Sequence, residues 1–188
     1  MKIFNTYTII CVLAHAEITL ATSSTAECGH TDNHAGEALI RAALGGRTDT
    51  VNLLVQSPTY FSADHTGKAL IQAARGGRTS IIEILLRFPF HIRIHNDYAG
   101  GALIGAALGG HTDAVNLLVN SPREISADHT GKALIQAATG GHTAIIEILL
   151  NCRTRISDNH VGEAIQTAVI GGHNKIVTAL QAYIASRS

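Results

Sequence analysis

Pairs of adjacent glycines recur along this chain of 188 residues at a nearly constant spacing. Five such pairs stand at 45–46, 76–77, 109–110, 140–141 and 171–172, and only the step from the second of these pairs to the third is slightly longer than the others. Around each pair the same order of residue types returns: Asp or Asn, usually His, a small residue, Gly, an Ala-rich segment, Gly-Gly, Arg or His, and an aliphatic run. Recurrence at such a period is the signature of a repeat architecture, in which each unit packs on its neighbours. The sequence therefore predicts a repeat domain over residues 33–188, with units at 33–63, 64–96, 97–127, 128–158 and 159–188.

A longer period, which spans two of these units, is superimposed on the shorter one. SADHTGKALIQAA occurs at Ser62–Ala74 and returns without change at Ser126–Ala138. When Ser62–Leu86 is aligned with Ser126–Leu150, the two segments differ only at Arg75, Arg78 and Ser80, which become Thr139, His142 and Ala144. We interpret the array as a duplicated block of two repeats.

Each unit is predicted to form two short helices joined by a turn. In the second unit, Lys68–Arg75 consists of good helix formers, and its alanines allow a neighbouring helix to approach closely. Asp64 is expected to cap this helix, and the Gly-Gly pair to end it, because glycine readily adopts the left-handed conformation found at helix C-termini. Residues 81–86 are aliphatic except for Glu83, and a helix that is apolar nearly all round must be buried on several sides. Stacked units satisfy this requirement, so we predict an all-α helical repeat solenoid of about five helix-turn-helix repeats.

The segment DHTGKALIQAATGGHTAIIEILL at Asp128–Leu150 resembles the ankyrin repeat. It has the family's Asp, its Gly, an alanine pair, Gly-His, and a second helix rich in aliphatic residues. The resemblance extends over residues 33–188. This chain departs from the family pattern in two ways. The family's Thr-Pro-Leu-His is replaced by EALI, KALI or GALI, and most units, such as 33–63 and 128–158, are shorter than is usual in the family.

The resemblance implies a stack of helix pairs that binds another protein without catalysing a reaction. It also implies that the first helices, together with the connectors before them, line the recognition surface. In the last unit, Lys175, Thr178 and Gln181 make the second helix more polar than its counterparts. We therefore expect this unit to be an end cap, because a terminal repeat needs a wettable outer face.

The amino-terminal segment, residues 1–32, allows two interpretations. Residues 1–16 resemble a signal peptide with a short apolar stretch, which would export the protein. Alternatively, the segment is a degenerate first repeat of an intracellular, cytoplasmic protein, since TIICVLA at Thr8–Ala14 resembles SIIEILL at Ser80–Leu86. Both interpretations stay open.

Histidine forms two columns when the units are aligned. The first contains His34, His65, His129 and His160, with Tyr98 in the third unit. Stacked helices lie about 8–10 Å apart, too far for neighbouring members to share one zinc ion at about 2 Å per ligand bond. We therefore expect this column to be structural. The second column contains Arg47, Arg78, His111, His142 and His173, and here the resemblance implies imidazoles that bond to backbone between repeats.

No other pattern predicts chemistry. Ser62, Asp64 and His65 have the residue types of a hydrolase triad, but neighbours in a turn rarely bring the base against both partners. His91 and His95 lie in a connector with no carboxylate or cysteine nearby to complete a metal site. No phosphate-binding loop of the GxxxxGK[ST] type occurs. The sequence predicts no enzyme, no cofactor, no metal and no small-molecule ligand.

Charge and hydropathy exclude further partner classes. Lys plus Arg number 14, as do Asp plus Glu, so the chain lacks the basic excess that binds nucleic-acid phosphates. No apolar run is long enough to cross a bilayer, so no membrane span is expected. The three cysteines, Cys11, Cys28 and Cys152, have neither metal nor redox spacing. We expect another protein as the partner; the alternative is an exported structural or surface repeat protein that acts as a spacer or shield.

Aromatic residues mark the predicted partner-binding site. Five of the eight lie in the connectors of units one to three, namely Tyr60, Phe61, Phe88, Phe90 and Tyr98. The duplicated connector has Arg-Glu-Ile at 123–125 instead. Because a packing requirement should survive duplication, we infer an interface role, for which aromatic side chains are effective anchors. Packing beneath the connectors is the alternative. Lys68 and Gln72, on the exposed side of the first helix, complete the predicted site.

Overall fold

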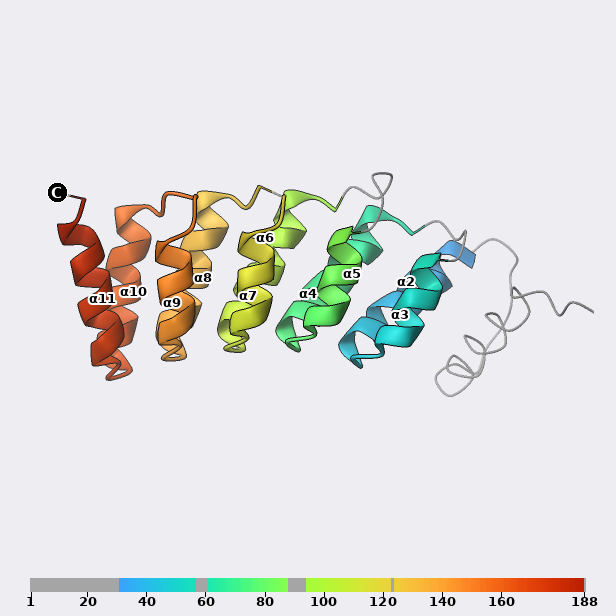
Figure 1. The fold of residues 1–188 in the computed structure, drawn as a ribbon, viewed down its shortest axis with the longest axis horizontal. Coiled ribbons are helices and arrows are strands. Elements are labelled where there is room, and N and C mark those ends of the chain that lie inside the picture. The colour runs from blue at the N-terminus through green and yellow to red at the C-terminus, as the bar shows by residue number, and fades with distance from the viewer. Residues whose placement is uncertain (1–30, 57–60, 88–93, 123, 188) are drawn as a thin grey trace, which may run out of the picture.

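The computed structural model describes residues 31–56, 61–87, 94–122 and 124–187 (Figure 1). Over these residues the chain forms ten α-helices and no β-strand, and the prediction of an all-α helical repeat stack is confirmed. None of the described helices is long and apolar enough to span a lipid bilayer. The signal peptide and the degenerate repeat were both predicted within residues 1–32, of which residues 1–30 lie outside the described residues.

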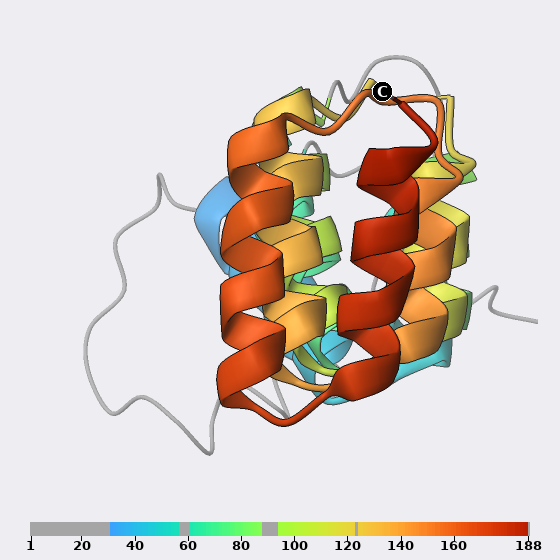
Figure 2. The ribbon, with the colours of Figure 1, turned by 90° about the vertical axis from the view of Figure 1, so that its left-hand side faces the viewer.

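The helices alternate between two layers, which Figure 2 shows end-on. In chain order they are α2 (Thr31–Leu44), α3 (Thr48–Gln56), α4 (Ala63–Arg75), α5 (Thr79–Arg87), α6 (Asn96–Leu108), α7 (Thr112–Val119), α8 (Ala127–Thr139), α9 (Thr143–Leu150), α10 (Asp158–Ile170) and α11 (Asn174–Ala185). The even-numbered helices pack side by side as a first layer, and the odd-numbered helices do the same as a second layer. Each even-numbered helix also packs on the odd-numbered helix that follows it. Every predicted unit thus contains one helix pair, whose first helix begins one or two residues before the predicted boundary.

Serine caps the first-layer helices for which a side-chain cap is found. Ser62 precedes α4 in an extended conformation, and its Oγ accepts the backbone N–H of His65 at 3.2 Å. Ser126 and Ser157 have the same role before α8 and α10. The expectation that Asp64 is the cap is wrong, because Asp64 lies inside the first turn of α4. A carboxylate is still favourable there, near the positive end of the helix dipole.

The two glycines of each pair have different conformations. The first is the C-cap of the helix and has a negative φ, as at Gly76, where φ is −91°. The second has a φ between 63° and 73°, at Gly46, Gly77, Gly110, Gly141 and Gly172. Residues with a Cβ rarely adopt this region, so the second glycine allows the chain to reverse into the next helix.

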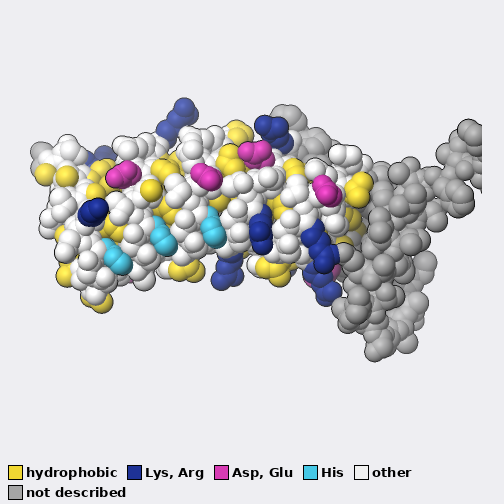
Figure 3. All heavy atoms as spheres, turned by 60° about the horizontal axis from the view of Figure 1, so that its bottom comes forward, with side chains coloured by type: hydrophobic (Ala, Val, Ile, Leu, Met, Phe, Trp, Pro, Cys, Tyr) yellow, Lys and Arg dark blue, Asp and Glu magenta, His cyan; other side chains and the backbone are white. Residues whose placement is uncertain are grey.

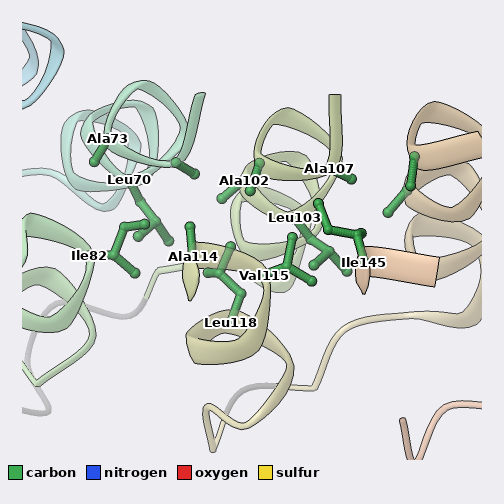
Figure 4. Close-up of a cluster of buried hydrophobic side chains, with 14 of the residues drawn as sticks. Leu70, Ala73, Ile82, Ala102, Leu103, Ala107, Ala114, Val115, Leu118 and Ile145 are labelled. Carbon is green, nitrogen blue, oxygen red and sulfur yellow. The ribbon is translucent and has the colours of Figure 1, made fainter. Parts of the chain in front are cut away.

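The hydrophobic core lies between the layers and runs along the whole stack (Figure 4). Leu70 and Leu103 of the first layer meet Ile82 and Val115 of the second, and all four side chains are fully buried. Leu85 is also fully buried, as expected for a second helix that is apolar on most sides. The shared core joins the repeats into one continuous stack.

Candidate partner-binding surface

Each repeat after the first packs an aromatic ring of its first helix on a glycine of the repeat before it. We call a glycine covered in this way by a side chain of the next repeat an acceptor glycine. The pairs are His65 on Gly36, Tyr98 on Gly67, His129 on Gly100 and His160 on Gly131. A Cβ built on any of these glycines would come within 2.2–2.4 Å of the ring, far inside van der Waals contact. Glycine is therefore required for this close approach, and the first column packs repeats together.

Hydrogen bonds hold these rings in place. The Nδ1 of His65 lies 2.7 Å from the Oγ of Ser62, and the fourth and fifth repeats have the same contact. In the third repeat the hydroxyl of Tyr98 donates to Oδ1 of Asp64, in the repeat before. Because Asp64 bonds to Tyr98 and Lys68, it does not orient His65 as the acid of a hydrolase triad would.

The second column lies at the Gly-Gly turns, where Figure 3 shows a row of histidine and basic side chains across the molecule. It has acceptor glycines of its own: Gly46 for Arg78, Gly77 for His111, Gly110 for His142 and Gly141 for His173. The Nε2 of His111 lies 3.0 Å from the carbonyl oxygen of Arg75, in the preceding repeat. This is the backbone contact between repeats that the resemblance implied. In the described part of the chain, no group of three or more His, Cys, Asp or Glu is arranged to hold a metal ion.

A family model of ankyrin repeats, in three copies, matches residues 103–186. This chain contains ankyrin repeats. The match begins within α6 and covers all of α7–α11, and the ring-on-glycine contacts continue with the same geometry into the repeats before it. The comparison with curated proteins finds no match. Ankyrin repeats mediate interactions between proteins, so the surface most relevant to function is the one that the repeats present together.

One row of the ankyrin repeats lies on the exposed side of the first layer. It consists of Glu37, Lys68, Gly101, Lys132 and Glu163, one residue from each repeat. The Nζ of Lys68 lies 2.7 Å from Oδ2 of Asp64, one turn earlier on α4, and Lys132 makes the same contact with Asp128 on α8. The duplication has thus placed two identical, exposed ion pairs on helices that flank α6.

The pKa values of Asp64, Lys68 and Asp128 are shifted toward their charged forms. The ammonium of Lys68, followed by the hydroxyl of Tyr98, holds the pKa of Asp64 below its ordinary value. The hydrogen bond from Lys132 likewise lowers the pKa of Asp128. Asp64 in turn raises the pKa of Lys68 and of Tyr98. Both aspartates are therefore charged at neutral pH.

Between the two ion pairs, α6 has glycines instead of long side chains. Gly101 and Gly105 stand where α4 has Lys68 and Gln72. A Cβ on Gly105 would come within 2.6 Å of Cγ of Arg75, so the glycine lets this arginine lie across α6. Gly105 is consequently buried, and Gly101 is partly exposed beside Ile71 of α4. We call the outward sides of α4, α6 and α8, with the two ion pairs and Arg75, the central surface.

The predicted site residues fall into three groups. Tyr60, Phe88 and Phe90 lie outside the described residues. Lys68 is exposed and Gln72 is partly exposed, and both lie on the central surface. The remaining two, Phe61 and Tyr98, lie at contacts within the protein.

Phe61 is 5% exposed and belongs to the hydrophobic core. It occupies the position before the helix cap that Ile94, Ile125 and Ile156 occupy in later repeats. For this residue the packing alternative holds, because an aliphatic side chain fills the same position elsewhere. Tyr98 is half-buried, with its ring on Gly67. Neither residue projects from the protein as a free anchor would.

The predicted site residues cover only the first half of this surface. Lys132 and Gln136 repeat the positions of Lys68 and Gln72, and the identity of Ser62–Ala74 with Ser126–Ala138 was the signal that could have found them. The glycines of α6, at 101 and 105, were also visible in the sequence. Aromatic content drew attention to the connectors instead.

Proposed function

We propose that this chain is a protein-interaction module without catalytic activity, and that it binds its partner through the central surface. The observation that supports this proposal is the duplicated pair of charged residues on α4 and α8, which flank α6. Each of these two helices carries an exposed lysine held by an aspartate at 2.7 Å. Another protein can contact both charged pairs and the surface between them at once.

The rigidity of the stack favours binding. Association costs free energy for every flexible side chain that becomes ordered, and a side chain that is already held loses less. Lys68 and Lys132 are oriented by their ion pairs, and Arg75 lies against Gly105. Their helices are anchored by fully buried residues, Leu70 in α4 and Leu134 in α8. The central surface is therefore organised before a partner arrives.

The aromatic connectors remain part of the proposal at Tyr60, Phe88 and Phe90. Aromatic side chains are effective anchors at interfaces and would supply apolar contact area to a partner. Phe61 is left out because its ring is buried.

The experiment is capture of binding proteins from an extract of the source cells with four immobilised samples: the wild type, Lys68→Glu with Lys132→Glu, Glu83→Lys with Glu147→Lys, and a blank. Glu83 and Glu147 are exposed on the second layer and are duplicated in the same way, so they form a matched control. We expect a protein that the wild type and the second-layer control retain and that the lysine variant loses. Identical retention by all three chains would contradict the proposed surface.

A further inference from the structure

The turn between α4 and α5, in the second repeat, differs in charge from its duplicate in the fourth. The duplicated segments of these two repeats differ at three positions, and all three lie at or beside this turn. Two of the differences concern an arginine, since Thr139 stands in place of Arg75 and His142 in place of Arg78. Duplication has thus kept the helices and changed the polar groups of the turn.

The fold does not need these arginines. In the fourth repeat His142 covers Gly110 in the way that Arg78 covers Gly46 in the second. Helices α4 and α8, which lead into the two turns, are also equally long, with 13 residues each. Because the same packing is achieved without arginine, a role beyond packing is indicated for the arginines of the second repeat.

Glycines of the neighbouring repeats hold both arginine side chains. Arg75 lies along α6, where a Cβ on Gly105 would come within 2.6 Å of its Cγ, and Arg78 lies over Gly46, with its Nε 2.7 Å from a Cβ built there. Both side chains remain exposed. No carboxylate of the described residues forms an ion pair with either guanidinium, whereas the two lysines of the central surface are each paired with an aspartate. The turn therefore presents two oriented cations whose charge is not compensated.

An exposed apolar side chain lies next to this charge. Leu108 has the position on α6 that Arg75 has on α4, and it is 50% exposed. The two helices pack side by side in the first layer, so the leucine and the arginine are neighbours on the surface. Along the same edge, the second column changes from arginine in the first two repeats to histidine in the last three, as the colours of Figure 3 show. The positive charge is thus confined to one part of the edge.

We propose that Arg75 and Arg78 bind an acidic segment of the partner protein, in which an aliphatic side chain next to the carboxylates covers Leu108. This inference rests on the proposed function, because it specifies the chemistry of the partner that the central surface binds. Carboxylates fit the site, since a guanidinium group can bind a carboxylate through two parallel hydrogen bonds. Because both arginine side chains are already held against glycines, little side-chain entropy is lost on binding.

A nucleic acid fits this site less well. Nucleic-acid binding requires a basic stripe that follows several phosphates, whereas the charge here is confined to one turn. A nucleic acid also offers no aliphatic side chain to Leu108. The combination of two cations with an exposed leucine therefore favours a protein segment.

The test measures the binding of two fluorescent peptides to the full chain, by anisotropy at low ionic strength. One is a short polyglutamate, and the other has the same length with a pair of leucines at its centre. Arg75→Thr with Arg78→His, which we call the turn variant, copies the fourth repeat and should therefore fold. We expect it to bind both peptides about tenfold or more weakly than the wild type. Arg153→Thr with Arg155→His removes the same charge from exposed positions elsewhere and should bind both peptides as the wild type does.

Leu108→Ser separates the apolar contact from the charge. The wild type should bind the leucine-containing peptide more tightly than the polyglutamate, although that peptide has fewer carboxylates, and Leu108→Ser should remove this difference. A wild type that binds neither peptide overturns the proposal, as does wild-type affinity in the turn variant or an equal loss in the Arg153 and Arg155 control. Tighter binding of an oligouridylate of the same length than of either peptide also overturns it, because the arginines would then serve a nucleic acid.

Capture from the cell extract separates this inference from the proposed function. A protein that both the turn variant and Lys68→Glu with Lys132→Glu lose supports the two proposals together. If the turn variant retains a protein that the lysine variant loses, the acidic segment is wrong and the central surface stands. Retention by both variants contradicts both proposals.

Discussion

The imidazole of His129 lies so close to Gly100 that a Cβ built on the glycine would be 2.2 Å from the ring. The same relationship joins four successive pairs of repeats, and it gives each interface one position where only glycine fits. We therefore expect Gly100→Ala to lower the free energy of unfolding by about 1–3 kcal/mol, the usual cost of forcing extra volume into a packed site. Urea denaturation followed by circular dichroism measures this change.

Gly162→Ala is the control for that substitution. Nothing from another element lies within 4 Å of its Cβ, so the only effect should be the better helix propensity of alanine, about 1 kcal/mol of stabilisation. An equal change in the free energy of unfolding for Gly100→Ala and Gly162→Ala would show that ring packing does not constrain the interface between repeats.

Leu85 and Leu149 are fully buried and occupy the same position in nearly identical segments. Replacing either by alanine should cost about 2–5 kcal/mol, the range for an emptied aliphatic site. The two values should be similar, because the duplicated repeats surround both residues with nearly the same side chains. Chemical denaturation of each variant tests this, and a cost below about 0.5 kcal/mol at both, typical of surface positions, would mean that the second layer is not buried.

The stack was predictable from sequence because its determinants are local and repeated. The Gly-Gly pairs set the helix ends, and the aliphatic run at residues 81–86 required burial. The helix cap was not predictable in the same way, since Ser62 and Asp64 are both good capping residues and stand two positions apart. Only the location of the first helical turn decides between them.

The candidate site was less predictable because exposure depends on packing between repeats. Phe61 stands in a connector, where an aromatic residue can project or turn inward, and alignment with Ile94 and Ile156 was needed to recognise a core position. Lys68 was found from helix periodicity. Its fixed orientation comes from Asp64 on the same helix, and the bond from Tyr98 to that aspartate joins two different repeats. Such a contact between repeats cannot be read from spacing within one unit.

Asp64 and Asp128 share the same lysine contact but differ in one hydrogen bond, the one that Tyr98 donates to Asp64. Tyr98→Phe should therefore raise the pKa of Asp64 and leave the pKa of Asp128 unchanged. Carboxyl-detected NMR titration of both residues measures this directly. An unchanged pKa of Asp64, or an equal rise in the pKa of Asp128, would show that the hydrogen bond from Tyr98 does not stabilise the Asp64 carboxylate.

The same pKa shifts fix the sign of a pH effect on stability. Each aspartate has a pKa in the folded protein that lies below its unfolded value of about 3.9. Its contribution to the stability of the folded protein is therefore fully present above about pH 3.9 and is lost as pH falls through the folded pKa. We expect the urea midpoint to fall with acidification below about pH 4, and Asp64→Asn with Asp128→Asn to reduce this fall. Because both pairs are exposed, added salt should weaken the effect. A pH dependence that is identical in the double variant would contradict the assignment.

Phe88 and Phe90 test the connector part of the proposed site. We expect Phe88→Ala with Phe90→Ala to weaken the binding of the captured partner by about 2 kcal/mol or more, as for aromatic anchors at interfaces, while the melting temperature stays unchanged. Partner titration and thermal melting are measured on the same preparation. A large loss of stability with unaltered affinity per folded molecule would identify the rings as packing residues and remove them from the site.

The most direct test of the central surface is hydrogen–deuterium exchange of the chain alone and with the protein that it captures. The account predicts that the partner slows exchange in peptides from α4, α6 and α8, while α5, α7 and α9 exchange as in the free chain. Slower exchange only in the second-layer helices, or no slowing in α4, α6 and α8, would contradict the proposed central surface.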